Sequence, residues 1–298
     1  MENKLTIKDS SVSFLTSVIL CQFGTLFFAT IGLIIASLFG VTSESFLLFL
    51  NTAVGSLILS IFMDGLIVLT FFIFNKNKNN KITTKPTIKK VLIYISIAII
   101  CYLLLYPIVT IFNNLIYKFF PRNDLKYELT LANYFISLIS MVLLPAIAEE
   151  LLFRGLIFKG LQKHSNTFAI IISSLMFTLF HLSLEQTIYP ILMGLVLAVI
   201  MCYENNIIYC IIVHFINNFT TLTLKYFNIS LVFNHWSYFI LAFVCAIIFV
   251  TLITLAIKKL KTPKQKIEGE HKAYFSICIG IIFIIWLATQ ISIITKGI

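Results

Sequence analysis

The stretch LTLANYFISLISMVLLPAIAEELLFRGLIF, residues 129–158, decides the fold class of this chain. It is long and apolar enough to cross a membrane as one helix. It nevertheless contains the adjacent acids Glu149 and Glu150 and, four residues after the second, Arg154. An ionisable side chain at that depth raises the free energy by several kcal/mol unless it is paired or solvated. We therefore expect these residues to mark a functional site inside a membrane-spanning helix.

The whole chain has the composition of a polytopic membrane protein. Hydrophobic residues make up 59% of its 298 residues and charged residues only 11%, which excludes a soluble globular domain. Apolar stretches broken by polar loops predict an all-α transmembrane helix bundle with eight or nine spans. The candidate spans are residues 11–40, 46–74, 88–118, 131–161, 166–184, 187–203, 206–225, 235–258 and 273–295.

Two lysine-rich loops predict the orientation of the bundle. Residues 75–90 and 258–272 each hold a dense group of lysines beside an apolar span, and such loops remain on the cytoplasmic side of a membrane. Six candidate spans separate the two loops, an even number, so both loops can lie on one side. The N-terminus is then expected in the cytoplasm and the C-terminus outside. The loop that holds Lys118, Arg122 and Lys126 falls outside as a mild exception.

The net charge of +10 does not indicate nucleic-acid binding. No aromatic-basic surface or nucleic-acid-binding module accompanies the lysines, and their place beside apolar spans makes membrane lipid the expected partner. The six cysteines are scattered through apolar segments without a CxxC pair. Neither a disulfide framework nor a thiolate zinc site is therefore indicated.

Glu149 and Glu150 are expected to take different roles. On a helix, Glu150 and Arg154 share a face, so the guanidinium can neutralise that carboxylate. Glu149 lies about 100° round the helix axis, free to face a cavity and to accept a proton from water. Pro145, one turn earlier, removes the intrahelical donor of the Met141 carbonyl and is expected to bend the helix. The alternative is that the Glu150–Arg154 pair only locks two helices together.

Three further polar residues lie at similar depth in later spans. His181 follows Phe177 by one turn, although a histidine at the end of a span can also be a plain interfacial residue. His214 and Asn218 are four residues apart and point the same way. They can both donate hydrogen bonds to an oxygen that becomes negative, or they form an interhelical hydrogen-bonded pair. A carboxylate base, an imidazole and oxyanion donors together suit acyl hydrolysis.

These motifs resemble those of a known family. EELLFR matches an EExxxR pattern, FTLFH an FxxxH pattern and HFINN an HxxxN pattern, in the order found in the CPBP family of intramembrane proteases. That family, also called Abi or CAAX-protease-like, includes bacteriocin-processing and self-immunity proteins and type II CAAX prenyl endopeptidases. The resemblance covers residues 131–225, interpreted as a catalytic core of about four to five helices. Membrane spans in residues 1–130 and 226–298 flank this core.

The resemblance implies a role for each motif residue. Glu149 would activate the attacking water, His181 would help to hold it, and His214 and Asn218 would stabilise the oxyanion. The second acid and the arginine of EELLFR would be structural support. No cofactor is expected, although Glu149, His181 and His214 could alternatively hold a zinc ion with an open fourth position. The metal-free site is favoured because ligation would occupy the carboxylate that is needed as the base.

The predicted function is an intramembrane endopeptidase that hydrolyses a short membrane-associated or leader-containing peptide. The motif residues lie roughly 12–22 Å from the inner ends of their spans, so entry of the peptide from the cytoplasm is expected. A bacteriocin or signalling-peptide precursor is preferred as substrate over a prenylated tail. This preference rests on the family resemblance and on a Lys/Ile/Asn-rich composition that is typical of a low-GC bacterium. The same composition indicates that the protein lies in a bacterial cell membrane. Two other classes stay open: a non-catalytic bacteriocin self-immunity or scaffold protein, and a membrane transporter.

Other polar residues within the spans are expected to serve packing. Asp64 in the second span is better explained by helix packing or topology than by catalysis. Gln22, Asn51, Asn133 and Gln290 are expected to form hydrogen bonds between helices.

Overall fold

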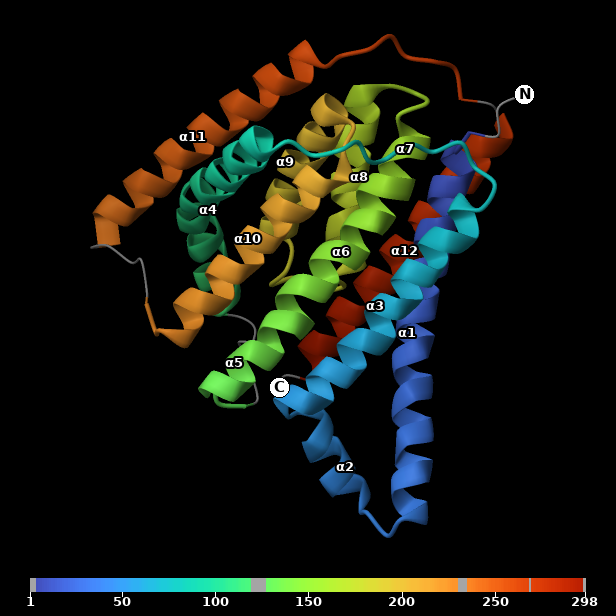
Figure 1. The fold of residues 1–298 in the computed structure, drawn as a ribbon, viewed down its shortest axis with the longest axis vertical. Coiled ribbons are helices and arrows are strands. Elements are labelled where there is room, and N and C mark those ends of the chain that lie inside the picture. The colour runs from blue at the N-terminus through green and yellow to red at the C-terminus, as the bar shows by residue number, and fades with distance from the viewer. Residues whose placement is uncertain (1–3, 119–126, 230–234, 268, 297–298) are drawn as a thin grey trace.

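The computed structural model describes the whole chain except residues 1–3, 119–126, 230–234, 268 and 297–298. Its described residues form one bundle of helices and connecting loops (Figure 1), which confirms the predicted all-α fold. The elements are α1 (Ile7–Leu38), α2 (Ser43–Leu50), α3 (Ala53–Asn75), α4 (Ile88–Ile116), α5 (Leu131–Ser137), the π-helical turn η1 (Leu138–Leu143), α6 (Leu144–Glu150), the π-helical turn η2 (Leu151–Ile157), α7 (Phe158–Leu161), α8 (Asn166–Phe180), α9 (Ile188–Glu204), α10 (Ile207–Tyr226), α11 (His235–Lys259) and α12 (Gly269–Lys296).

Within the described ranges, seven helices are long and apolar enough to span a membrane: α1, α3, α4, the continuous helix from α5 to α7, α10, α11 and α12. Two of the candidate spans are shorter, since α8 has 15 residues and α9 has 17. At 1.5 Å per residue they are about 22–26 Å long, less than the roughly 30 Å of a bilayer's hydrocarbon core. The expected eight or nine spans are therefore corrected to seven spans and a helical hairpin.

The hairpin of α8 and α9 starts and ends at the same end of the bundle. At the start of α8, Asn166 donates a hydrogen bond of 2.8 Å to the Leu260 carbonyl in the lysine-rich loop between α11 and α12. At the end of α9, Glu204 forms an ion pair of 2.5 Å with Lys90, at the start of α4 and next to the other lysine-rich loop. The turn of the hairpin, residues 181–187, lies at the other end of the two helices, and most of its residues are at least partly buried. The hairpin returns to its starting side, so it does not change the side of the membrane on which the later loops lie. The predicted topology is therefore unchanged.

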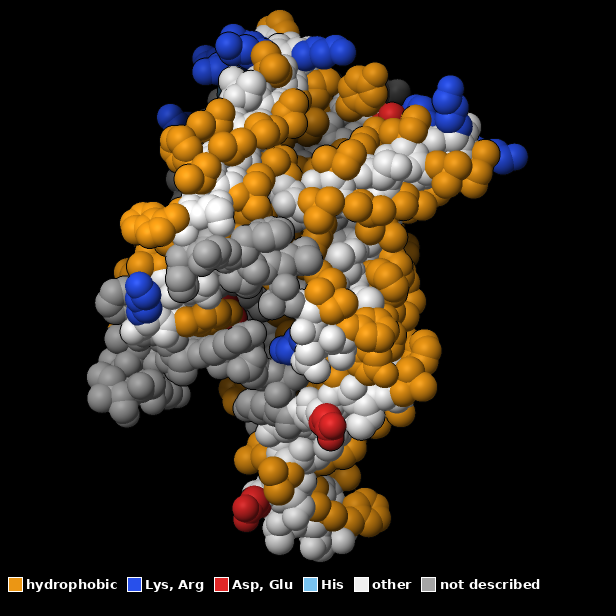
Figure 2. Space-filling model, turned by 90° about the vertical axis from the view of Figure 1, so that its left-hand side faces the viewer, with side chains coloured by type: hydrophobic (Ala, Val, Ile, Leu, Met, Phe, Trp, Pro, Cys, Tyr) orange, Lys and Arg blue, Asp and Glu red, His pale blue; other side chains and the backbone are white. Residues whose placement is uncertain are grey.

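Lysines and apolar side chains occupy different zones of the surface. Figure 2 shows Lys and Arg side chains gathered at one end and hydrophobic side chains covering the middle of the molecule. Large apolar side chains halfway along their helices are exposed, such as Leu26 (64%), Ile100 (62%) and Phe243 (68%). A soluble monomer rarely exposes such a belt. The belt is the surface expected to face lipid, with the lysines at one membrane surface.

The second predicted span begins later than the sequence indicates. A single span is expected over residues 46–74, but the helix breaks at Asn51 and Thr52, between α2 and α3. Thr52 Oγ1 accepts a hydrogen bond of 3.1 Å from the Gly55 N–H and so caps α3. The Asn51 amide donates to the Leu47 carbonyl of its own helix, so the interhelical bond expected of it is wrong.

The helix that carries the two acids changes its hydrogen-bond register twice. The π-helical turns η1 and η2 flank the short α6, which ends at Glu150. Just before Pro145, the Leu144 N–H bonds to the carbonyl of Ile139, five residues back. Proline has no N–H to donate, and a π turn is one way in which a helix absorbs such an interruption. The irregularity expected at Pro145 is therefore present as a π turn.

Side chains from distant segments pair with carbonyls of the second π turn. Ser10 Oγ donates a hydrogen bond of 2.9 Å to the Ile157 carbonyl, and Asn80 Nδ2 donates one of 2.8 Å to the Gly155 carbonyl. The approach of α1 is close, because a Cβ on Gly160 would lie 2.0 Å from Ser10 Oγ. Such bonds satisfy backbone groups that find no water inside a membrane. The N-terminal helices thus hold the helix that bears the acids.

The last helix holds the turn of the α8–α9 hairpin. Gln290 Nε2 donates a hydrogen bond of 2.9 Å to the Leu182 carbonyl, and Gln290 Oε1 accepts one of 3.0 Å from the Leu184 N–H. Leu182, directly after His181, has a φ of +48°, a left-handed conformation that is unfavourable for leucine. The bonding to another element predicted for Gln290 is confirmed, whereas the Asn133 amide donates to the Glu128 carbonyl of its own chain segment.

Reporter fusions can test the orientation of the bundle. We expect reporters inserted at Lys85 and Lys264 to lie on the cytoplasmic side, because both loops are lysine-rich and the hairpin preserves parity. A reporter fused at the end of α12 should lie outside. Opposite locations for the Lys85 and Lys264 reporters would contradict the seven-span arrangement.

Candidate active site

A cavity of about 650 Å³ brings the four predicted catalytic residues together. It lies between α4, the segment from η1 to α6, the α8–α9 turn, α9 and α10. Glu149 comes from α6, His181 from the end of α8, and His214 and Asn218 from α10, and all four line the cavity. Residues that are far apart in the sequence therefore share one space that can hold a substrate.

The two adjacent acids are separated as the sequence predicts. Glu149 lines the cavity, whereas Glu150 is completely buried and does not line it. Glu150 Oε1 accepts hydrogen bonds of 2.9 Å from both Arg154 Nη1 and His214 Nδ1. Glu149 has a looser contact, with its Oε2 3.9 Å from His214 Nε2. The acid that faces the cavity is thus the one without an arginine partner.

The buried arginine joins three helices. Arg154 is completely buried, and besides Glu150 its Nη2 donates a hydrogen bond of 3.2 Å to the Gly194 carbonyl of α9. Its guanidinium carbon lies 4.6 Å from the centre of the Phe177 ring on α8, a favourable cation–π distance. Through the bond from Glu150 to His214, the same network reaches α10. The sequence offered helix locking as the alternative role of the Glu150–Arg154 pair. The structure contains both features, because the pair joins the helices and the cavity lies beside it.

Phe177 sets the position of both histidines. Its ring packs edge-on against His181 and His214, with centroid distances of 5.0 and 6.0 Å. The His181 Nδ1 lies 2.9 Å from the Phe177 carbonyl. A carbonyl only accepts, so Nδ1 must donate, and the Nε2 atom of a neutral His181 is an acceptor.

His214 and Asn218 present donors from one face of α10. His214 Nδ1 faces a carboxylate oxygen and must donate to it, so its Nε2 becomes a donor only when the ring carries both protons. Asn218 Nδ2 donates to the Met141 carbonyl over 3.5 Å, the carbonyl that Pro145 deprives of its usual donor. Asn218 keeps a second amide hydrogen for a ligand in the cavity.

Two observations bear on the zinc alternative. In the part of the chain that the structure describes, no three His, Cys, Asp or Glu side chains are grouped so that they could hold a metal ion. Both histidines bond through Nδ1, His214 to Glu150 and His181 to a backbone carbonyl, which leaves Nε2 of each neutral ring available as a ligand. Whether activity needs a metal stays a prediction for experiment.

The cavity extends away from the lysine-rich end of the bundle. It reaches Asn113 near the end of α4, Lys225 near the end of α10 and the exposed Gln186 in the hairpin turn. Toward the lysine-rich end it is closed by fully buried side chains such as Leu156 and Cys210. The depth of the motif residues favoured entry from the lysine-rich end, whereas the lining of the cavity extends toward the opposite end, so the direction of entry stays a prediction.

Sequence reasoning missed part of the cavity wall. Tyr102 and Tyr106 of α4 line it, although α4 lies outside the motif-bearing residues 131–225. Their spacing of four residues, two polar aromatic side chains on one helix face, was the available signal. Tyr189 on α9 also lines the cavity, and its hydroxyl is buried without a hydrogen-bond partner among the described atoms. Asp64, in contrast, does not line the cavity.

Comparison with known families agrees with the motifs. A family model described as type II CAAX prenyl endopeptidase Rce1-like matches residues 131–220, a segment that contains all of the motif residues. The resemblance to the CPBP, or CAAX-protease-like, family is thereby confirmed over these residues, and it supports a membrane endopeptidase in general. No curated protein and no solved structure matches the chain.

Removing either partner of the buried pair should destabilise the protein. We expect Glu150→Ala or Arg154→Ala to lower the free energy of unfolding by about 3–5 kcal/mol, because each leaves a buried charge without its partner. Unfolding by heat or denaturant in detergent would measure the loss. The double variant Glu150→Ala/Arg154→Ala should lose less than the sum of the two single changes. Additive losses would show that the pair is not coupled.

Proposed function

We propose that the chain is an intramembrane endopeptidase in which Glu149 activates a water molecule for attack on a peptide bond. One observation carries the proposal: Glu149 faces a cavity together with both histidines, while Glu150 is withdrawn and neutralised. A helix-locking role accounts for Glu150 and Arg154 but leaves a second acid facing the cavity without an arginine partner. That acid is suited to general-base catalysis.

The attacking water would be bound by two acceptors. It donates one hydrogen to the Glu149 carboxylate and the other to His181 Nε2, which is free to accept because Nδ1 holds the proton. A lone pair of the water oxygen then points toward the substrate carbonyl. As the new C–O bond forms, Glu149 takes the proton, and it gives the proton to the leaving amine when the C–N bond breaks.

The developing oxyanion would be stabilised by His214 and Asn218. A doubly protonated His214 donates through Nε2, and the Asn218 amide adds a second donor. The charges of the site then balance, with Glu149 and Glu150 opposite Arg154 and His214. When Glu149 becomes neutral by taking the proton, the oxyanion replaces its negative charge. The local net charge is therefore unchanged during the attack, which suits a site in a poorly hydrated environment.

The substrate would be a short peptide or a peptide tail in an extended conformation. A helix hides its carbonyls in its own hydrogen bonds, so the scissile segment must be unwound. With the lysine-rich loops in the cytoplasm, the direction of the cavity supports entry from the outer side of the membrane. We place a bacteriocin or signalling-peptide precursor first and a prenylated tail second. The prenylated tail is kept because the matching family is described as a prenyl endopeptidase.

The substrate order can be tested with reconstituted protein. Vesicles that contain it would be offered a leader-peptide precursor and a farnesylated C-terminal peptide, and the products would be identified by mass spectrometry. Cleavage of the precursor supports the order given. Cleavage of the farnesylated peptide alone, with loss of cleavage when its lipid is removed, would reverse it.

Glu149→Gln is the decisive variant. It keeps the shape of the side chain but cannot accept the proton, so we expect hydrolysis to be abolished while the unfolding temperature stays near that of the wild type. Asn218→Ala should lower the rate about 10²–10³-fold through loss of an oxyanion donor.

Glu44→Gln provides the control, since Glu44 is an exposed acid on α2 and does not line the cavity. It should keep near-normal activity. Near-normal activity of Glu149→Gln would rule out the proposed base.

Chelation tests the role of metal. If Glu149 is a base and not a ligand, purified protein should keep its activity after prolonged treatment with a chelator and should contain less than one zinc per chain. Activity that is lost with the chelator and restored by zinc would make Glu149, His181 and His214 the metal ligands.

A further inference from the structure

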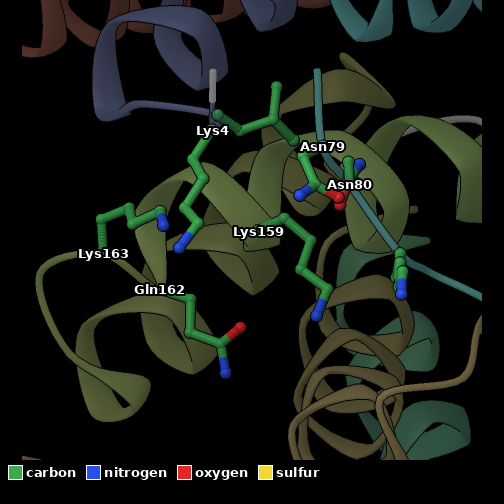
Figure 3. A pocket seen from close by; sticks show the side chains of 8 residues that line it. Lys4, Asn79, Asn80, Lys159, Gln162 and Lys163 are labelled. Atoms are coloured by element: carbon green, nitrogen blue, oxygen red, sulfur yellow. The ribbon is translucent and has the colours of Figure 1, made fainter. Parts of the chain in front are cut away.

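A second pocket, of about 340 Å³, lies at the lysine-rich end of the bundle, opposite the mouth of the first cavity. Four segments form it: the N-terminal segment before α1, the α3–α4 loop, α7 and the turn after α7 (Figure 3). Its lining residues are Lys4, Leu5, Asn79, Asn80, Lys81, Lys159, Gln162 and Lys163. Figure 3 shows the Lys4 and Lys163 side chains extending toward the same space, beside the Gln162 amide.

The lining of this pocket carries only positive charge. Four of its described residues are lysines and none is acidic. A concave site lined by one sign of charge concentrates ions of the opposite sign.

The fold holds these lysines close together despite their repulsion. Lys159 Nζ donates to the Asn205 side chain at the end of α9, which fixes its position. Asn80 is anchored by its bond to the Gly155 carbonyl, and Gln162 by a bond of 2.9 Å to Asn166. The buried Leu5 forms an apolar part of the wall, with 4% of its surface exposed. These buried and hydrogen-bonded residues thus shape the pocket, and the exposed side chains of Lys4, Lys81 and Lys163 surround its opening.

We propose that this pocket binds a phosphate-bearing anion, with the headgroup of an anionic phospholipid as its source. Lysine ammonium groups bind phosphate oxygens through charge-assisted hydrogen bonds. The pocket lies where the helix from α5 to α7, which is long and apolar enough to span a membrane, ends. Lipid phosphates are expected at the ends of such helices. Basic pockets between membrane helices on the cytoplasmic side suit such headgroups.

Binding there would brace the helix that carries the candidate catalytic acid. Lys159 belongs to that helix, and Asn80 bonds to its second π turn. A ligand that joins the N-terminal segment, the α3–α4 loop and α7 binds only the folded protein and therefore stabilises it. Anionic lipid should accordingly raise the unfolding temperature, and a zwitterionic lipid should not.

Lipid binding to the purified full chain in neutral detergent tests the proposal. The probes are phosphatidylglycerol and phosphatidylcholine, with native mass spectrometry for affinity and thermal unfolding for stability. The variant Lys4→Gln/Lys81→Gln/Lys163→Gln removes three exposed charges and leaves the more buried Lys159 in place, so its fold should be retained. Each lysine near an anionic surface contributes about fivefold in affinity, so the variant should bind phosphatidylglycerol about a hundredfold more weakly.

The control variant is Lys261→Gln/Lys264→Gln/Lys266→Gln, which removes the same charge from the α11–α12 loop outside the pocket. It should keep its affinity within about threefold, less than the loss of one pocket lysine. An equal loss in both variants, or equal binding of the two lipids by the wild type, would overturn the proposal.

Soluble glycerol phosphate provides a last test, of the source of the phosphate. If it stabilises the wild type as well as the lipid does and this effect is lost in the pocket variant, the phosphate site stands and its source is a soluble phosphate.

Discussion

The structure depends on one buried interaction, the ion pair between Glu150 and Arg154 with His214 as a third member. Such a pair adds little net stability in comparison with apolar residues, because both charges lose their hydration. Its importance lies in what it arranges: α6, α8, α9 and α10 all contact it, and Glu150 is occupied by it. The neighbouring Glu149 is then the acid that faces the cavity. Glu149 and Glu150 thus have different surroundings because Arg154 bonds to only the second of them.

The two π turns make the helix that carries these residues dependent on its neighbours. A regular α-helix satisfies its own carbonyls, but a π turn releases some of them, and a membrane supplies no water in their place. Ser10, Asn80 and Asn218 provide the donors, from α1, the α3–α4 loop and α10. The motif-bearing segment therefore needs the flanking helices, although the family match covers only residues 131–220.

The short hairpin of α8 and α9 explains why a cavity exists. A helix of 15 residues is shorter than the hydrocarbon core of a bilayer, and α8 ends beside the cavity. Its end therefore places His181 beside Glu149, and the space beyond the hairpin turn is left for a substrate. Gln290 of α12 secures this turn at the strained Leu182. The lysine-lined pocket lies near the opposite end of the helix that bears Glu149, so the two cavities have different linings: one is mixed and largely apolar, and the other is basic.

The sequence by itself determined the all-helical membrane fold, because apolar runs of span length and lysine-rich loops are properties of local composition. It also predicted that Glu150 pairs with Arg154, since an i, i+4 spacing fixes which side chains share a helix face. That Glu149, His181, His214 and Asn218 share a site was predicted from their similar depth in the spans and from the family resemblance. The tertiary structure decided what local pattern cannot express. Whether 15 or 17 apolar residues cross the membrane or turn back depends on what their ends bind, here Leu260 and Lys90. The direction in which the cavity opens, the contribution of Tyr102 and Tyr189 to its wall, and the meeting of four lysines around one pocket all depend on contacts between segments that are distant in the chain.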